Sequence, residues 1–298
     1  NGLIKRTNTS AFKAQRRGGK GVIGMKTRKA TTDKEVSDFI EHLFPANTHD
    51  YLMFFTNTGR VYVERVHEIP DLGRASKGRS IANVLELKHS EKIADVIRVK
   101  AVYGENKEDL TWQQDRCIFF TTRSGTAKKT ALSDFANVRR GGIVAIKIVP
   151  GDTLIEARFT TGHDDVILVT ADGQSIRFHE EGVRTMGRAA AGVRGIRLGK
   201  DDHVVALSIV SPDATLLVAG ENGIGKRTVF DDYRVQSRGG KGIKTMKITK
   251  KTGKVVGGLT VHDGDEIMLI TVGGQMVRTS VDGIRQTGRN TQGVRLVN

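Results

Sequence analysis

Short apolar stretches recur along the chain, and each runs into a glycine and continues as an alternating, basic stretch. Five copies are complete, with the sequences LMFFTNTGRVYV, CIFFTTRSGTAKK, VILVTADGQSIR, LLVAGENGIGKR and IMLITVGGQMVR. Their turn glycines are Gly59, Gly125, Gly173, Gly223 and Gly274. Two stretches of strand character around a glycine predict a β-hairpin, and Asn-Gly, Asp-Gly and Gly-Gly pairs suit type I′ turns. The opening segment from Asn1 to Arg6 reads as the outgoing half of a sixth hairpin.

An arginine follows each turn glycine at a constant distance of fifteen residues. These arginines are Arg17, Arg74, Arg140, Arg188, Arg238 and Arg289. Five stand in glycine-bearing loops, RGGKG (17–21), GRASKG (73–78), GRAAAG (187–192), SRGGKG (237–242) and GRNTQG (288–293). In the shorter third copy, RRGGIV (139–144), Ile143 and Val144 are expected at the lysine and glycine positions. A further strand and another apolar segment follow each loop, so each repeat holds about four strands.

Six such repeats, with no segment of helical period, predict an all-β fold: a propeller-like ring of six four-stranded blades. The 35 glycines and 4 prolines agree with many tight turns. We expect one domain over 1–298, with approximate repeats at 1–46, 47–100, 101–160, 161–211, 212–262 and 263–298, the first and last blades being incomplete. The polar segments 27–37 and 103–114 are expected to be surface loops.

The charge of the chain narrows the class of partner. Lys and Arg number 48 against 33 Asp and Glu, which gives a net charge of +15 and favours polyanions. A hydrophobic content of 38% excludes a disordered tail, and no apolar run approaches the ~18 residues of a membrane span. Cys117 has no partner for a disulfide, which favours a reducing, cytoplasmic compartment. Because the chain begins at Asn1, we expect it to be a piece of a longer protein.

Basic residues recur in phase with the hairpins. The fourth residue after the turn glycine is basic in every copy but one, where Val63 stands, and lysine often precedes it. One basic site per blade predicts a belt of positive charge around the ring, to which duplex DNA fits. Solvated strand residues that deter edge pairing are the alternative. Loop glycines allow backbone N–H groups to approach phosphates, and arginine donates to them in pairs.

Nothing in register predicts readout of bases. Aromatic residues make up 5% of the chain and do not recur between the basic positions, and neither do Asn or Gln. We therefore expect contacts to the DNA backbone without sequence specificity. Outside the first loop, the predicted contact residues are Lys5, Arg6, Arg74, Lys77, Arg79, Lys128, Lys129, Arg139, Arg140, Arg177, Arg188, Arg194, Lys226, Arg227, Arg238, Lys241, Lys244, Arg278 and Arg289.

The first loop in its context, QRRGGKG, resembles the signature box of the C-terminal domain of DNA gyrase A, and QSRGGKG (236–242) differs from it only at Ser237. The resemblance covers the whole chain and implies a non-catalytic, six-bladed β-pinwheel that wraps duplex DNA with positive handedness. The wrapped segment would be presented for ATP-dependent negative supercoiling by the holoenzyme, a DNA topoisomerase. The DNA-binding box would then be Gln15, Arg16, Arg17, Gly18, Gly19, Lys20 and Gly21.

The same resemblance implies the setting of the domain. Its partners would be the rest of gyrase A, together with gyrase B, in an A2B2 holoenzyme, within the bacterial cytoplasm and nucleoid and without membrane contact. The isolated domain would be a monomer. We expect no cofactor in this chain, since ATP and Mg²⁺ would be used by other parts of the holoenzyme.

Three other functions compete with this interpretation. The C-terminal domain of topoisomerase IV shares fold and DNA binding, but by the resemblance it lacks an intact box. A protein-interaction propeller of the WD type is disfavoured because no Trp-Asp pair recurs and Trp112 is the single tryptophan. ATP binding is suggested by the P-loop spacing of GENGIGK (220–226). It is disfavoured because Arg227 follows where a P-loop has the Ser or Thr that binds magnesium. Histidines and Cys117 show no catalytic or metal-binding spacing, so no catalytic or metal-ligating residue is predicted.

Overall fold

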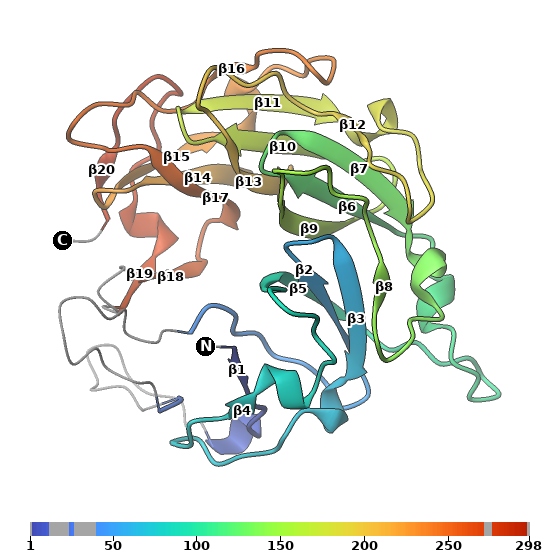
Figure 1. Cartoon of the computed structure of the whole chain (residues 1–298). Coiled ribbons are helices and arrows are strands. Elements are labelled where there is room, and N and C mark those ends of the chain that lie inside the picture. The colour runs from blue at the N-terminus through green and yellow to red at the C-terminus, as the bar shows by residue number, and fades with distance from the viewer. Residues whose placement is uncertain (1, 12–23, 27–39, 271–275, 297–298) are drawn as a thin grey trace.

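In the computed structural model, antiparallel sheets are arranged around a common centre (Figure 1). The structure describes residues 2–11, 24–26, 40–270 and 276–296. Within them lie four four-stranded and two two-stranded sheets, and the helices are single 3₁₀ turns. The all-β ring predicted from the repeats is therefore confirmed. Gln15 to Gly21, the turn glycine Gly274 and the predicted loop 27–37 lie outside the described residues.

The predicted hairpins form the middle of the sheets. Their strands are β2 (Tyr51–Thr56) and β3 (Arg60–Arg65), β6 (Cys117–Thr122) and β7 (Thr126–Ala131), β10 (Asp165–Thr170) and β11 (Gln174–His179), β14 (Ala214–Gly220) and β15 (Ile224–Val229), and β18 (Glu266–Ile270) and β19 (Met276–Ser280). Strand β1 (Leu3–Ile4) is the outgoing half of the first hairpin. In the four-stranded sheets each incoming strand lies between two other strands, and its apolar side chains are buried.

The prediction of type I′ turns is wrong. In the first complete hairpin the Gly59 N–H donates to the Thr56 carbonyl at 2.9 Å, which encloses Asn57 and Thr58. Type I′ needs positive φ at both central residues, but among the residues of this loop only Gly59 has it, at 82°. The loop is a three-residue connection with a glycine bulge, which right-handed strand twist also accommodates. Gly125, Gly173 and Gly223 repeat this conformation.

The fourth strand of each blade comes from the following repeat. Strand β8 (Ile143–Val144) belongs to the third repeat, yet it pairs with β3 of the second through Val61 and Ile143. The same exchange joins β4 (Arg79–Ser80) to β1, β12 (Val193–Arg194) to β7, β16 (Ile243–Lys244) to β11 and β20 (Val294–Arg295) to β15. Each repeat therefore does not build a blade by itself, and every glycine-bearing loop of the described residues is seated on its neighbour.

The inner strands join blade to blade. They are β5 (Ile93–Val99), β9 (Leu154–Thr160), β13 (Val204–Ile209) and β17 (Val255–His262), and Figure 1 shows β5, β9 and β17 facing the centre of the ring. The Asp95 carboxylate on β5 accepts the Ala157 N–H of β9 at 3.0 Å. Glu156 on β9 in turn accepts the Leu207 N–H of β13 at 2.5 Å. Such bonds fix the spacing of consecutive blades.

The hydrophobic core lies between blades as well as within them. Phe55 from the second blade packs edge-on against Phe120 of the third, with ring centroids 5.4 Å apart. The predicted surface loop 103–114 is tied to the second blade, where the Tyr51 hydroxyl donates to Asp109 at 2.7 Å. Burial of apolar side chains between neighbours stabilises the ring as a stack of interdependent blades.

The 3₁₀ turns mark the path from hairpin to loop. They are η1 (Thr9–Ala11), η2 (Val66–Glu68), η3 (Ile81–Asn83), η4 (Thr111–Gln113), η5 (Leu132–Phe135), η6 (Glu180–Gly182), η7 (Phe230–Asp232) and η8 (Val281–Gly283). Most of them follow an outgoing strand directly, and the chain then turns towards the loop that precedes the exchanged strand.

The closing glycine of each loop is a sensitive position. Gly242 has φ +73°, and a Cβ on it would lie 2.3 Å from the Ser175 carbonyl oxygen of the preceding blade. We expect Gly242→Ala to lower the free energy of unfolding by about 2 kcal/mol or more, measured by urea denaturation. Gly187→Ala, whose Cβ would meet nothing within 4 Å, is the control and should stay within about 0.5 kcal/mol of the wild type. Equal losses for both variants would contradict this packing.

Candidate nucleic-acid interface

The glycine-bearing loops end at one backbone feature, a glycine with positive φ directly before the exchanged strand. These closing glycines are Gly78, Gly142, Gly192, Gly242 and Gly293, with φ between 69° and 97°. A loop that closes against a neighbouring hairpin carbonyl needs this left-handed conformation and the absence of a Cβ. The loops therefore sit on the outer side of the preceding blade and next to its outgoing strand.

The third loop is shorter than the constant fifteen-residue offset predicts. Its closing glycine is Gly142, and Ile143 and Val144 form strand β8. Gly142 follows its turn glycine by seventeen residues, against nineteen in the other copies. The expectation that Ile143 and Val144 stand at the lysine and glycine positions is wrong. Arg140 lies two residues before its closing glycine, whereas Arg188 lies four residues before Gly192. The two arginines share the distance of fifteen residues from the turn glycine, but they do not occupy the same position in the loop.

Three lysines predicted to lie on an exposed belt point instead into the fold. Lys128 and Lys226 are fully buried. The Lys128 Nζ donates to the carbonyl oxygens of Ala145 at 2.6 Å and Arg188 at 2.8 Å. Lys226 donates to the Gly288 carbonyl at 2.6 Å and to that of Arg289, and Lys5 donates to those of Gly73, Arg74 and Ser76. A buried ammonium needs such acceptors, because an unpaired one is strongly destabilising.

The next residue in each outgoing strand is also used by the fold. Lys129 is buried and pairs with Glu180 of the following repeat at 3.4 Å. Arg177 pairs with Asp165 at 2.7 Å and donates to the Phe230 carbonyl. Arg6 and Arg227 behave alike, since Arg6 binds Asp71 and the Ile69 carbonyl and Arg227 binds Asp263 and the Ile284 carbonyl. Arg278 differs, because it is exposed and pairs with Glu266 of its own hairpin.

These contacts correct the sequence interpretation. The pattern of charge predicts that the column from Arg6 to Arg278 contacts DNA or forms a solvated strand face. In the described residues most of its side chains instead hold the 3₁₀ turn of the next repeat against the hairpin. Their phase with the loops follows from this role, because each hairpin supports the loop segment of the following repeat.

Exposed positive charge lies on the loops and the exchanged strands. The predicted residues that are exposed there are Lys77, Arg79, Arg139, Arg140, Arg194, Arg238, Lys241 and Lys244, and Arg74, Arg188 and Arg289 are partly exposed. Among the predicted hairpin residues, Arg278 is exposed, and Lys5, Arg6 and Arg177 are partly exposed. Arg238 is held in place, since its Nε donates to the Gly182 carbonyl at 2.6 Å. The strands that carry Arg194 and Lys244, β12 and β16, lie at the outer edge of the ring in Figure 1.

A second set of exposed basic residues, which recurs at one position of the repeat, was not predicted from the sequence. Five residues after the closing glycine stand Lys147, Arg197 and Lys247, and Lys26 occupies the matching position of the first repeat. The backbone N–H of each donates to a carbonyl of the next loop, as Arg197 does to Gly240 at 2.8 Å. These side chains therefore lie where two loops meet. Counting from the closing glycine instead of the hairpin turn finds them.

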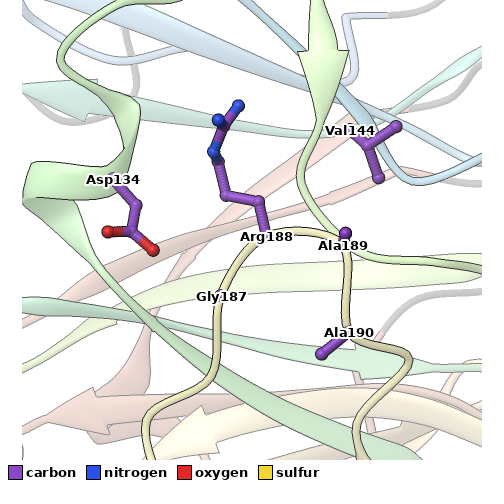
Figure 2. Close-up of a pocket in the computed structure, with 6 residues that line it drawn as sticks. All are labelled: Asp134, Val144, Gly187, Arg188, Ala189 and Ala190. Atoms are coloured by element: carbon purple, nitrogen blue, oxygen red, sulfur yellow. The ribbon is translucent and has the colours of Figure 1, made fainter.

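A hollow on the rim shows how one loop presents its arginine. Figure 2 shows the Arg188 side chain extending between Asp134 and Val144. Gly187, Ala189 and Ala190 complete the lining. Within the described part of the chain, the Arg188 guanidinium makes no hydrogen bond or ion pair. It is free to bind an anion such as a phosphate.

Other chemistry is not assembled in the described ranges. No three His, Cys, Asp or Glu side chains gather there to hold a metal ion. The segment GENGIGK (220–226) runs from the end of β14 through the turn into β15, so a strand and not a helix follows its glycines, and Lys226 is buried on carbonyl oxygens. Within the same ranges, every helix is too short to cross a bilayer.

Burial makes two of the inward lysines sensitive to alkaline pH. It lowers the pKa of both Lys128 and Lys226 from 10.5 to about 8. Below pH 8 the fold therefore carries the cost of two buried charges. Between pH 8 and 10.5 the folded chain has lost protons that the unfolded chain still binds, so this cost disappears as pH rises.

We expect the wild type to gain stability relative to a Lys128→Met/Lys226→Met variant as pH rises from 8 to 9.5. Urea denaturation of both proteins across this interval measures the difference. Comparing the two chains cancels tyrosine and thiol titrations that they share. Parallel curves would show that the two ammonium groups are not desolvated as the structure has them.

Comparison with known proteins agrees with this architecture. The family model described as DNA gyrase C-terminal domain, beta-propeller, matches residues 1–47, 50–100, 118–161, 164–211, 214–262 and 265–298. DNA gyrase A of Mycolicibacterium smegmatis is 43% identical over 299 residues, which cover 100% of this chain and 34% of that protein. DNA gyrase A of Escherichia coli K12 is 43% identical over 296 residues, covering 99% and 32%. The chain thus spans about a third of the length of these relatives.

Two solved structures share the fold over nearly the whole chain. A DNA gyrase A C-terminal domain superposes with a TM-score of 0.76 at 26% identity, covering 99% of this chain and 92% of that one. The C-terminal domain of a DNA topoisomerase IV superposes with a TM-score of 0.77 at 25% identity, covering 100% and 86%. Fold similarity does not separate the two, whereas the matches at 43% identity over this whole chain are to gyrase A proteins.

Proposed function

The chain belongs to the DNA gyrase C-terminal domain family, and we propose from this premise that it binds duplex DNA without sequence specificity and wraps it around the outer edge of the ring. Residues 1–298 act as one domain, with the six repeats given above. The wrapped DNA has positive handedness and is presented to the rest of gyrase for negative supercoiling. Handedness comes from the family resemblance.

One observation carries the proposal: two exposed basic columns follow the same edge of consecutive blades. Arg194 and Lys244 lie on exchanged strands of successive blades, and Arg197 and Lys247 lie three residues further on. Because strand exchange repeats, the charge recurs at each blade instead of gathering in one patch. An edge of this kind follows the phosphate backbone of a bent duplex.

The proposed contact set is divided by exposure. Exposed loop and strand cations, together with Lys147, Arg197 and Lys247, contact phosphates directly. The inward lysines Lys5, Lys128 and Lys226 support the loops from below, and Arg6, Lys129, Arg177 and Arg227 hold the segment of the 3₁₀ turn that precedes each loop. Gln15 to Gly21 remain predicted DNA contacts, based on their match to the family box, and lie outside the described residues.

The domain supplies DNA geometry and no reaction step. ATP and Mg²⁺ are used by other parts of an A2B2 complex made with the rest of gyrase A and with gyrase B. Bending DNA costs on the order of several kcal/mol per site, which phosphate contacts on successive blades offset. The chain by itself is a monomer, and the complex acts in the bacterial cytoplasm on the nucleoid.

The salt dependence of DNA binding tests this assignment. We expect Lys241→Ala/Lys244→Ala/Lys247→Ala to reduce the slope of log K against log salt by about 3 and to weaken binding at low salt by about tenfold or more. The measurement is fluorescence anisotropy of a labelled duplex titrated with the chain at several salt concentrations.

A matched variant separates edge contacts from net charge. Lys92→Ala/Lys100→Ala/Lys107→Ala removes three lysines outside the loops and exchanged strands. It should leave the slope within about 1 of the wild type, because bulk charge contributes only at long range. Equal losses in both triple variants would contradict binding at the outer edge, and a wild-type slope near zero would contradict DNA binding itself.

A further inference from the structure

In the described loops, the residue on which a loop rests alternates between lysine and an uncharged side chain. Three residues after the turn glycine, the first, third and fifth repeats have lysine, namely Lys5, Lys128 and Lys226. The second, fourth and sixth have uncharged residues, namely Tyr62, Ile176 and Val277. In the blades whose exchanged strand is described, the loop above this residue comes from the following repeat.

The sequences of the loops alternate together with the residues beneath them. Above the lysines stand GRASKG (73–78), GRAAAG (187–192) and GRNTQG (288–293). Above Tyr62 and Ile176 stand the paired-glycine sequences RRGG (139–142) and RGGKG (238–242). The sequence of a loop therefore matches the residue beneath it, although that residue belongs to another repeat about 60 residues away.

Loops of the lysine class share one contact. In each of them the buried or half-buried lysine donates to the carbonyl oxygen of the loop arginine itself, which is Arg74, Arg188 or Arg289. That carbonyl is thereby held facing inward. Since a peptide plane is rigid, its orientation also sets that of the following N–H group and restricts where the arginine side chain leaves the backbone.

The paired-glycine loop above Ile176 has another backbone. Gly239 has φ +80°, whereas the corresponding residues of the lysine class, Ala75, Ala189 and Asn290, do not have positive φ. A Cβ on Gly240 would lie 3.6 Å from the Ile176 Cδ1, so the loop packs closely on an apolar surface. Ile176 carries no ammonium to bind its carbonyls, and the Gly239 N–H instead donates to the Gly195 carbonyl at 2.6 Å.

We propose that Lys5, Lys128 and Lys226 are positioning residues for DNA binding: each holds the loop arginine of the next repeat so that its side chain meets phosphate. Among the described loops, those above Lys5, Lys128 and Lys226 are thus supported by a lysine, and the loop above Ile176 rests on an apolar side chain. The loop above Tyr62 is held in a third way, since the Arg60 guanidinium donates to the carbonyl oxygens of Gly141 at 2.6 Å and Gly142 at 2.8 Å. This inference rests on the proposed function for the phosphate contact alone. The support of the loop by lysine is testable without DNA.

Lys128→Met removes the ammonium at nearly constant length. We expect the amides of 187–192 to exchange hydrogen several-fold faster in the full chain and DNA affinity to fall about threefold or more. Lys100→Ala, which loses the same charge on the surface, is the control and should change neither by more than about twofold. Circular dichroism checks that the ring is folded, and Lys5→Met, at a partly exposed lysine, gives the same test at residues 73–78 if Lys128→Met does not fold.

A second change tests the matching of loop and support. Lys128→Ile/Ala189→Gly/Ala190→Gly converts the fourth loop to the paired-glycine class and restores no charge. Recovered protection and affinity, up to the level of Lys100→Ala, would support the inference. Unchanged exchange in Lys128→Met would overturn it.

Two further outcomes separate the inference from the proposed function. Faster exchange in Lys128→Met with the affinity of Lys100→Ala would show that the lysine supports the loop but does not position an arginine on DNA, which overturns the inference and leaves DNA binding standing. Absence of salt-dependent DNA binding by the wild type would overturn the proposed function and, with it, the phosphate contact of Arg188.

Discussion

Exchange of the outer strand links each repeat to the one before it and positions the loops at the edge of the ring. A strand of two residues, such as Val193–Arg194, pairs with the outgoing strand of the preceding hairpin through Ala127 and Thr126. Two features support so short a pairing: the left-handed Gly192 brings the chain down onto that hairpin, and Lys128 binds the loop behind it through the Arg188 carbonyl. Loop, glycine and strand therefore act as one connection between neighbouring repeats.

This connection divides the positive charge of the chain into two populations. Cations on the outgoing strand lie beneath the next loop and must find carbonyl or carboxylate partners, as Lys128 and Lys129 do. Cations on the loop, on the exchanged strand and just after it face solvent at the outer edge. The inward population stabilises the surface that the outward population presents, so the two recur in phase along the chain, with Val63 as the break in the inward column.

Much of the fold can be predicted from periodicity, because the hairpins and closing glycines are local features. Strand exchange cannot be predicted in this way, because no pattern within a repeat indicates which hairpin its outer strand will pair with. The roles of Lys128 and Lys226 are hidden for a related reason: lysine is rarely fully buried, and its acceptors are backbone atoms of another repeat, invisible in a sequence pattern. Aligning the repeats by distance from the hairpin turn misaligns the third loop. The feature that recurs in every described loop is the closing glycine with positive φ, which is Gly142 in the third copy. Alignment from the hairpin turn also hides Lys147, Arg197 and Lys247.

Under the proposed function, the outer edge of the ring holds DNA along a curved path of a single handedness. Ligating nicked circular plasmid in the presence of increasing amounts of the chain, removing the protein and resolving the topoisomers on a gel measures this directly. Chiral wrapping with positive handedness predicts a linking-number distribution that shifts to positive values with protein concentration. Binding with no shift, or a negative shift, would contradict it.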